Sequence, residues 1–465
     1  MSWLVSLSVE LKRTLEVPKV RFNSTIPLFF HLVVCFSFPA LGAALLFDTD
    51  DTGVSAQKAP LVRPWKIVRM DPDYAGMWVV AGDVDNDGEV EFVSAMNHNE
   101  GDVHYTATAV AHKLDGTILW RWGDPAKGRK KLHHDVALQI HDWDGDGRSE
   151  VVLLGDQELV ELDGTTGKEK RRLPIEEQAS DCLIFCDLTG RGRPTDFLTK
   201  TRYSTIWAYD REGKLLWKSH LPGGYRTAHQ ARPMDIDGDG LDEIMAGYAL
   251  LNSDGSVRWV YESKTVDQKR GHLDCARMFR RGKDPQDTRI VLTCCGANNI
   301  AVINGLGEPV WETPGHHFES ADVGRVFPDR ETFQIVVDID HRPRNESPLW
   351  VFDEEGTHLG QIMTVYCRHH GLVDWTGDGF CEMVVGQGSG IYDHRGRRIC
   401  TLDVTPPEEG MDRGGQILHV GDMDGDGVPD VALSTSDAVY VFKNEKGRAS
   451  QGSVPLGSGL NYTLY

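Results

Sequence analysis

The stretch Asp83-Val-Asp85-Asn-Asp87-Gly88 lies between two short apolar runs, and its alternating acids followed by glycine recur along the chain. Further copies begin at Asp142, Asp235, Asp374 and Asp422, a sixth with fewer acids occupies residues 187–192, and degenerate copies lie near residues 280–287 and 326–331. A loop that recurs between strand-like runs indicates a repeat architecture.

A second marker recurs independently of the first. Short turn signals ending in glycine stand at residues 115–116, 163–164, 212–213, 254–255, 304–305, 355–356, 395–396 and 446–447. Such a turn between alternating apolar runs is a strong hairpin signal. Each marker occurs eight times, at a spacing of roughly 45 residues that is typical of propeller blades.

The repeats predict an all-β fold: a single eight-bladed β-propeller, with seven blades as the alternative. In each blade the acidic loop joins strand A to strand B, and the glycine turn joins strand C to strand D. We expect the ring to close through residues 61–70 and the final residues 461–465. Four tryptophans that follow the turns are expected to pack between blades: Trp120, Trp217, Trp259 and Trp311.

The N-terminal part predicts export. Residues 26–47 are mostly apolar, follow several basic residues and end in small residues at positions 40–44. This pattern favours a cleaved signal over an uncleaved membrane anchor. We therefore expect a signal or anchor at 1–48, a linker at 49–60, the propeller at 61–465, and a secreted or periplasmic protein. The eight cysteines of the exported part leave disulfides and buried thiols both open.

Composition excludes several classes of partner. The 465 residues include 49 Lys and Arg against 70 Asp and Glu, a net charge of −21. A general nucleic-acid or anionic-membrane binder needs a basic face, so neither is expected, and the membrane is a partner only if the N-terminal segment is uncleaved. The cysteines do not have the spacing of a structural zinc site. We expect a monomer.

The acidic loops predict several calcium ions with a mainly structural role. Acids at alternate positions, a glycine at the sixth and an acid at the ninth can wrap a hard cation in oxygen atoms. The predicted ligands are Asp83, Asp85, Asp87, Glu91, Asp142, Asp144, Asp146, Glu150, Asp235, Asp237, Asp239, Glu243, Asp374, Asp378, Glu382, Asp422, Asp424, Asp426 and Asp430. In the sixth copy we expect the side chain of Arg191 to take the place of the metal.

The residues just before strand A of each blade carry most of the candidate chemistry. If the acidic loops lie at one rim, these residues lie at the other, around the central funnel. They are His133, His134, Asp135, Tyr225, Arg226, His229, Gln230, His272, Asp274, His316, His317, Glu319, Arg368, His369, His370 and Arg413. Histidines at equivalent points of several repeats predict a shared site in the funnel.

The chain resembles the propeller-type rhamnogalacturonan lyases and the related propeller lyases that act on ulvan and on rhamnose–glucuronate ends. The resemblance rests on Gly-Gly-Tyr-Arg at 223–226, Gly-His-Leu-Asp at 271–274, Glu-Ser-Ala-Asp-Val-Gly-Arg at 319–325 and the terminal Asn-Tyr-Thr-Leu-Tyr. It implies a carbon–oxygen lyase that cleaves an acidic, uronate-containing polysaccharide by β-elimination.

That reaction needs a cation for the carboxylate, a base for the C5 proton and an acid for the departing oxygen. The expected base is His134 or His229, the acid Tyr225 or another histidine, and the cation Arg226 or Arg368. Expected substrate contacts are His272, His317, Arg368, His369, His370 and Arg413. Calcium in the funnel, held by Asp135, Asp274 or Glu319, is a second way to neutralise the carboxylate.

The alternative is a non-catalytic, calcium-stabilised propeller that binds glycans or a protein partner. The rim distinguishes the two hypotheses. Histidine, arginine and tyrosine side chains that converge within hydrogen-bond reach across blades favour catalysis, whereas dispersed side chains that face solvent favour binding.

Overall fold

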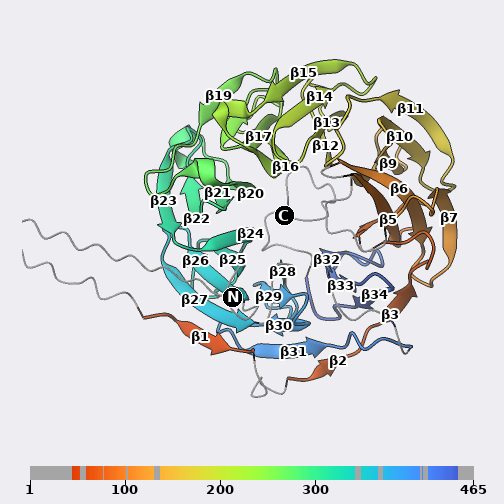
Figure 1. Ribbon diagram of the computed structural model, residues 1–465. Coiled ribbons are helices and arrows are strands. Elements are labelled where there is room, and N and C mark those ends of the chain that lie inside the picture. Colours follow the sequence, from red (N-terminus) through yellow and green to blue (C-terminus); the bar gives the residue numbers. More distant parts are fainter. Residues whose placement is uncertain are drawn as a thin grey trace, which may run out of the picture. The chain divides into compact units, whose positions relative to one another are not determined.

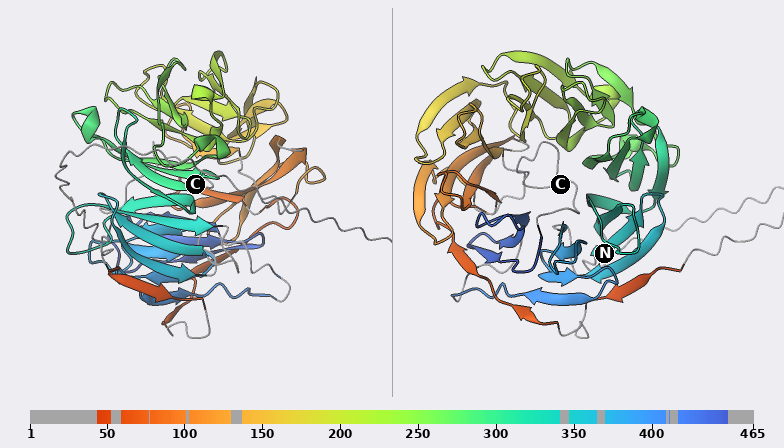
Figure 2. Two further views of the ribbon diagram at one scale, coloured as in Figure 1. Left: turned by 60° about the vertical axis from the view of Figure 1, so that its left-hand side comes forward. Right: turned by 180° about the vertical axis from the view of Figure 1, so that it is seen from behind.

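The computed structural model describes residues 44–52, 59–76, 78–100, 103–129, 137–340, 347–364, 370–408, 411 and 417–448. The chain divides into a unit of residues 1–44 and a unit of residues 45–465. The second unit contains eight antiparallel sheets of four strands, two of which carry an additional outer strand. The sheets follow one another around a ring, so the predicted eight-bladed β-propeller is confirmed (Figures 1 and 2).

The strands of each blade run from the centre outward in chain order. Blade 1 has β4 (Trp78–Gly82), β5 (Glu91–Glu100), β6 (Val103–His112) and β7 (Ile118–Gly123); blade 2 has β8 (Leu138–His141), β9 (Glu150–Gly155), β10 (Glu158–Asp163) and β11 (Glu169–Pro174). Blade 3 has β12 (Leu183–Cys186), β13 (Asp196–Lys200), β14 (Thr205–Tyr209) and β15 (Leu215–His220); blade 4 has β16 (Thr227–Met234), β17 (Glu243–Gly247), β18 (Ala249–Leu251) and β19 (Val257–Val260).

The second half of the ring repeats this order. Blade 5 has β20 (His272–Arg280), β21 (Arg289–Cys295), β22 (Asn299–Ile303) and β23 (Pro309–Pro314); blade 6 has β24 (His317–Gly324), β25 (Gln334–Asp340), β26 (Ser347–Asp353) and β27 (His358–Thr364). Blade 7 has β28 (His370–Val373), β29 (Glu382–Val385), β30 (Gly390–Tyr392) and β31 (Arg398–Leu402); blade 8 has β32 (Ile417–Gly421), β33 (Asp430–Ser434) and β34 (Ala438–Phe442). The short helices are η1 (Pro222–Gly224), η2 (Gln268–Arg270) and η3 (Pro285–Asp287).

The N-terminal strands complete the outer edge of the ring. β3 (Lys66–Arg69) pairs with β34 as the fourth strand of blade 8, so the last blade combines both ends of the propeller sequence. β2 (Leu61–Val62) adds a parallel strand to β31, and β1 (Phe47–Asp50) adds one to β27. The closing role of residues 61–70 is confirmed, and residues 461–465 lie outside the described residues. β1 lies in the stretch that was expected to be signal and linker, residues 1–60. Phe47 of this strand nevertheless packs in the core cluster of blades 6 and 7.

The tryptophans join neighbouring blades as predicted. The indole N–H of Trp217 in blade 3 donates to the carbonyl of Ser253 in blade 4 at 2.9 Å, and that of Trp259 donates to Gly305 of blade 5 at 3.0 Å. Gly255 lies under the Trp217 ring with a φ of 82°, where a Cβ atom would stand 2.6 Å from the ring. Glycine at this turn therefore leaves room for the tryptophan ring of the preceding blade.

Seven described cysteines are buried, and no disulfide joins any two of them: Cys182, Cys186, Cys275, Cys294, Cys295, Cys381 and Cys400. The described part of the chain contains no helix that is both long and apolar enough to cross a membrane. Most of the predicted export segment lies among residues 1–43, outside the described residues, so export stays a prediction.

Candidate functional site

The inner strands of three consecutive blades each carry a histidine at or near their first residue. His229 lies on β16, His272 begins β20 and His317 begins β24, whereas the acidic loops and their degenerate copies follow the last residues of these strands. β16 contacts β20, and β20 contacts β24, around the centre of the ring (Figure 1). The three histidines therefore lie at the rim opposite the acidic loops.

His229, His272, Tyr203 and Asp274 form one packed group, here called the histidine cluster. The two imidazole centroids are 4.7 Å apart, and the Tyr203 ring lies 4.5 Å from His272 and 5.3 Å from His229. Asp274 Oδ1 is 2.9 Å from His272 Nε2 and 3.6 Å from His229 Nε2. The Tyr203 hydroxyl lies 3.4 Å from His229 Nε2. A phenol, two imidazoles and a carboxylate at these distances can exchange protons with a bound molecule.

Burial sets the protonation of this cluster. It lowers the pKa of His272 to about 3 and raises the pKa of the Tyr203 hydroxyl. At neutral pH His272 is therefore a neutral imidazole and Tyr203 a protonated phenol. The cluster therefore places a proton donor, the Tyr203 phenol, beside the neutral imidazole of His272.

Cationic side chains border the histidine cluster. The guanidinium groups of Arg202 and Arg226 lie 5.3 and 5.8 Å from the Tyr203 ring centroid, and Arg202 Nε donates to the Tyr203 hydroxyl at 3.2 Å. Arg226 is exposed. Behind Arg202, the buried Lys200 ammonium donates to Asp181 at 2.6 Å. This border favours an anionic ligand, such as the carboxylate of a uronic acid.

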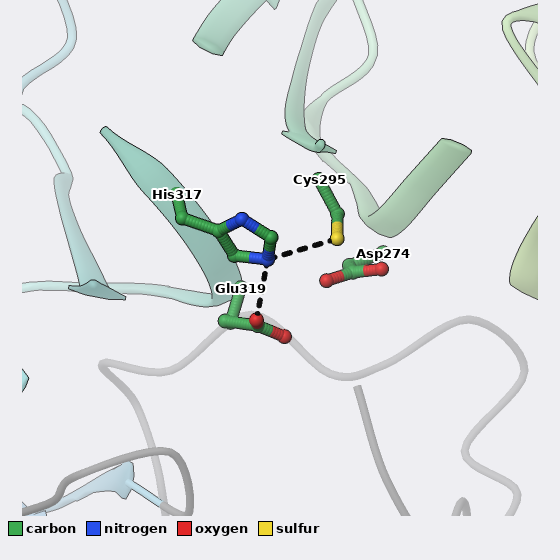
Figure 3. Close-up of side chains that lie close together, drawn as sticks. All are labelled: Asp274, Cys295, His317 and Glu319. Carbon is green, nitrogen blue, oxygen red and sulfur yellow. Dashed lines mark hydrogen bonds and ion pairs between the residues drawn. The ribbon is translucent and has the colours of Figure 1, made fainter. Parts of the chain in front are cut away.

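Asp274 also belongs to a second group of four side chains, here called the thiol cluster, with Cys295, His317 and Glu319 (Figure 3). Cys295 ends β21 opposite His272, and His317 and Glu319 lie on β24. His317 Nε2 is 3.0 Å from Cys295 Sγ and 2.9 Å from Glu319 Oε1. One ligand atom from each of these residues and from Asp274 lies within 4.8 Å of the others, so the four could hold a metal ion.

The remaining predicted rim residues are placed as follows. The Tyr225 hydroxyl donates to Glu262 at 3.0 Å, and its ring packs on Tyr248, 5.4 Å away. His370 begins β28, where its Nε2 lies 3.7 Å from Asp322 and its Nδ1 lies 3.9 Å from Asp338. Four further predicted site residues lie outside the described residues: His134, Arg368, His369 and Arg413.

Three residues of these clusters were not among those predicted from the sequence: Tyr203, Arg202 and Cys295. Tyr203 and Arg202 lie in the turn between β13 and β14, which reaches the same rim as the start of strand A. Cys295 faces His272 across the β20–β21 pair. The signal that could have identified Tyr203 and Arg202 is the rule that the turn between strands B and C shares a rim with the residues before strand A.

The acidic loops bring their carboxylates together as predicted. The first acid accepts backbone N–H groups further along the loop: Asp374 accepts from Gly377 at 2.7 Å and from Gly379 at 3.0 Å. The ninth residue accepts from the same loop, as Glu382 does from Trp375 at 2.7 Å. Burial raises the pKa of Glu382 to about 7. Several of these acidic groups could hold a metal ion, and calcium itself stays a prediction.

Four of the five acidic loops contain a cationic side chain of their own blade. The pairs join Lys113 to Asp85 and Asp87, Lys170 to Asp144 and Glu150, Arg258 to Asp237 and Glu243, and Lys443 to Asp424 and Asp426. Within the described residues, no lysine or arginine pairs in this way with the loop at Asp374. Arg191, which was expected to replace the metal, instead pairs with Glu212 at 3.0 Å. The prediction for Arg191 is therefore wrong, and the cationic side chains that do contact acidic loops are Lys113, Lys170, Arg258 and Lys443.

Similar proteins were found by sequence and by structure. The chain is 29% identical over 237 residues to rhamnogalacturonan endolyase YesW, and 27% identical over 267 residues to rhamnogalacturonan exolyase YesX, both of Bacillus subtilis strain 168. The curated relatives are rhamnogalacturonan lyases. The predicted resemblance is thereby confirmed. The matches cover 37% and 43% of this chain and only 38% and 43% of the relatives, and no protein-family model matches the chain.

The solved structures show the fold alone. The crystal structure of YesW matches 81% of this chain and 75% of its own, with a TM-score of 0.57 and 19% identity. The biofilm matrix protein Bap1 of V. cholerae matches 87% of this chain and 96% of its own, with a TM-score of 0.56 and 13% identity. Because a lyase and a matrix protein share the fold, function has to be argued from the site.

Proposed function

We propose that the protein is a polysaccharide lyase that cleaves a uronic-acid-containing polysaccharide of the rhamnogalacturonan or rhamnose–glucuronate type by β-elimination. The observation that carries the proposal is the histidine cluster: two imidazoles and a phenol from three blades converge within hydrogen-bond reach, with arginines beside them. The similarity to rhamnogalacturonan lyases supports the same reaction class.

The chemistry assigns a role to each group. Arg226, which is exposed beside the cluster, binds the uronate carboxylate and stabilises the negative charge that develops as C5 loses its proton. His229 Nε2 accepts the C5 proton. The Tyr203 hydroxyl donates its proton to O4 as the C4–O4 bond breaks and the C4–C5 double bond forms. His272 holds His229 in place through ring packing, and the Asp274 carboxylate, 3.6 Å from the same Nε2, stabilises the imidazolium that forms once His229 has taken the proton.

The test is an ultraviolet absorbance assay for unsaturated uronate on pectic rhamnogalacturonan, ulvan and rhamnose-capped glucuronans. His229→Ala and Tyr203→Phe should each reduce the rate by about 10²- to 10⁴-fold, the usual contribution of a positioned acid or base. Tyr225→Phe is the matched control, since its hydroxyl bonds to Glu262, and it should keep the rate. Undiminished product from both cluster variants would remove the assignment.

The non-catalytic hypothesis makes a different prediction for the same panel. A binding propeller would retain the polymer on an affinity gel without producing unsaturated ends. The convergence of His229, His272 and Tyr203 favours catalysis over that outcome.

Calcium and export complete the proposal. The loop oxygens suit calcium, and Lys113, Lys170, Arg258 and Lys443 would compete with the ion for the same carboxylates. An acidic polysaccharide substrate is met outside the cell, which agrees with the export pattern in residues 26–47. Detection of the protein in culture medium, trimmed near residue 44, would test export.

A further inference from the structure

The contacts around His317 differ from those of a nucleophile–histidine–acid relay. In such a relay the imidazole contacts the thiol with one nitrogen and the acid with the other. Here the same atom, Nε2, lies 3.0 Å from Cys295 Sγ and 2.9 Å from Glu319 Oε1. A single proton on Nε2 can serve only one of these acceptors at a time. The three donor atoms therefore converge on a point, as ligands do around a cation (Figure 3).

We propose that Cys295, His317, Glu319 and Asp274 bind one transition-metal ion of the zinc class. Zinc takes sulfur, imidazole nitrogen and carboxylate oxygen in a tetrahedral set. With bonds of about 2.0 to 2.3 Å, the ligand atoms of such a set lie about 3.3 to 3.7 Å apart. The separations of 2.9 and 3.0 Å, with all four atoms inside 4.8 Å, bracket that value.

The donor set selects against calcium at this point. Calcium takes six to eight oxygen ligands, whereas here a thiol and an imidazole supply half of the donors. The acidic loops at the opposite rim have the reverse character, because they offer carboxylate oxygens and backbone. The molecule thus combines soft donors at one rim with hard donors at the other.

Burial strengthens the argument for a bound cation. Asp274 is 1% exposed, Glu319 2% and Cys295 8%. Donor atoms that are out of contact with bulk water form an enclosed site, which is typical of structural zinc. His272 Nε2 lies 2.9 Å from Asp274 Oδ1 and orients that carboxylate, as supporting residues of metal ligands do.

The site also touches the proposed acid–base group, because Asp274 belongs to both clusters. Through Asp274, the ion would fix the position of His272 and His229. An effect of the ion on catalysis through these two histidines rests on the proposed lyase function, whereas metal binding itself does not.

The experiment uses the full chain. After dialysis against a chelator, the protein is reloaded with zinc or with cobalt(II), metal is counted by mass spectrometry, and the cobalt form is examined by absorbance. One equivalent should remain after desalting, with the visible bands of tetrahedral cobalt and the near-ultraviolet band of a cobalt–thiolate bond. Cys295→Ser and His317→Gln should lose the thiolate band or the bound ion. His272→Gln should lower the metal affinity by about 10- to 100-fold.

Cys294→Ser is the matched control, because Cys294 is the neighbouring thiol and its side chain points to the other face of β21. It should retain both the ion and the thiolate band. The proposal is overturned if the wild-type chain retains neither ion, or if the cobalt spectrum is unchanged in Cys295→Ser. A chain that binds the ion but cleaves no polymer would refute the lyase proposal alone, and an active chain without the ion would refute this one alone.

Discussion

Replacement of Lys113 by methionine separates the two ways of neutralising an acidic loop. The Lys113 ammonium contacts Asp85 and lies 2.6 Å from Asp87 and 3.8 Å from Glu91. The exposed fractions of these side chains are 23% for Lys113, 13% for Asp85 and 0% for Glu91. The burial of these ion pairs is intermediate. An exposed ion pair is worth about 0.5 kcal/mol, and breaking a buried one costs about 4 kcal/mol. We therefore expect Lys113→Met to lower the free energy of unfolding by about 2 kcal/mol in chelator.

Calcium should restore much of this loss. With a dissociation constant of about 10⁻⁴ to 10⁻³ M, about 10 mM calcium stabilises one site by about 1.4 to 2.7 kcal/mol. Urea unfolding in chelator and in calcium measures both values, and the exposed Lys127→Met, between β7 and β8, is the control. Wild type should gain less from calcium at this loop, because Lys113 competes with the ion. An equal loss in chelator and in calcium would refute the view that the two cations compete for one set of carboxylates.

Three further predictions test the fold. Gly255→Ala should destabilise by more than Gly116→Ala: both glycines have a positive φ, but only at Gly255 would a Cβ clash with a tryptophan ring, and thermal unfolding should place their melting temperatures in that order. His112 is buried and its pKa is lowered to about 4, so the unfolded chain binds more protons than the folded chain between pH 6.5 and 4. The free energy of unfolding should therefore fall by about 3 kcal/mol as pH falls through that window. His112→Gln should flatten this pH dependence of the free energy of unfolding, measured in urea. Lys200→Met should cost about 3 kcal/mol, because it removes the ammonium that donates to the buried Asp181 at 2.6 Å while the Arg202 guanidinium stays 3.5 Å from the same carboxylate. The double variant with Asp181→Leu should recover part of that loss in a double-mutant cycle.

The repeat pattern was sufficient to predict the fold because each blade uses two local signals. The acidic loop and the glycine turn act through backbone geometry, which a short sequence determines. Pairing of β3 with β34 could be anticipated because a closed ring needs one blade made from both chain ends. β1 was missed because a parallel outer strand of four residues has no turn signal beside it.

The site was only partly predictable. The position before strand A identified His229, His272 and His317, since that position is equivalent in every blade. Tyr203 lies in a blade whose inner strand has no histidine before it, and it reaches the cluster from a turn between two other strands. Cys295 depends on the register of β20 with β21, which sequence patterning does not determine.

The cationic partners of the acidic loops were missed for a similar reason. Lys113 and Lys443 directly follow strand C, whereas Lys170 and Arg258 lie on strand D. A common position in space is thus reached from two positions in the repeat. Only the packed blade shows that both side chains arrive at the same carboxylates.

Mass spectrometry of the fragments that the full chain releases from rhamnogalacturonan and from rhamnose-capped glucuronan tests the central claim most directly. Elimination leaves a C4–C5 double bond, so the new non-reducing end is lighter by one water than the end that hydrolysis would leave. We predict fragments of that lighter mass from the wild-type chain and none from the variant that combines Tyr203→Phe with His229→Ala. Fragments that have gained water, or polymer that is bound but uncut, would contradict the account.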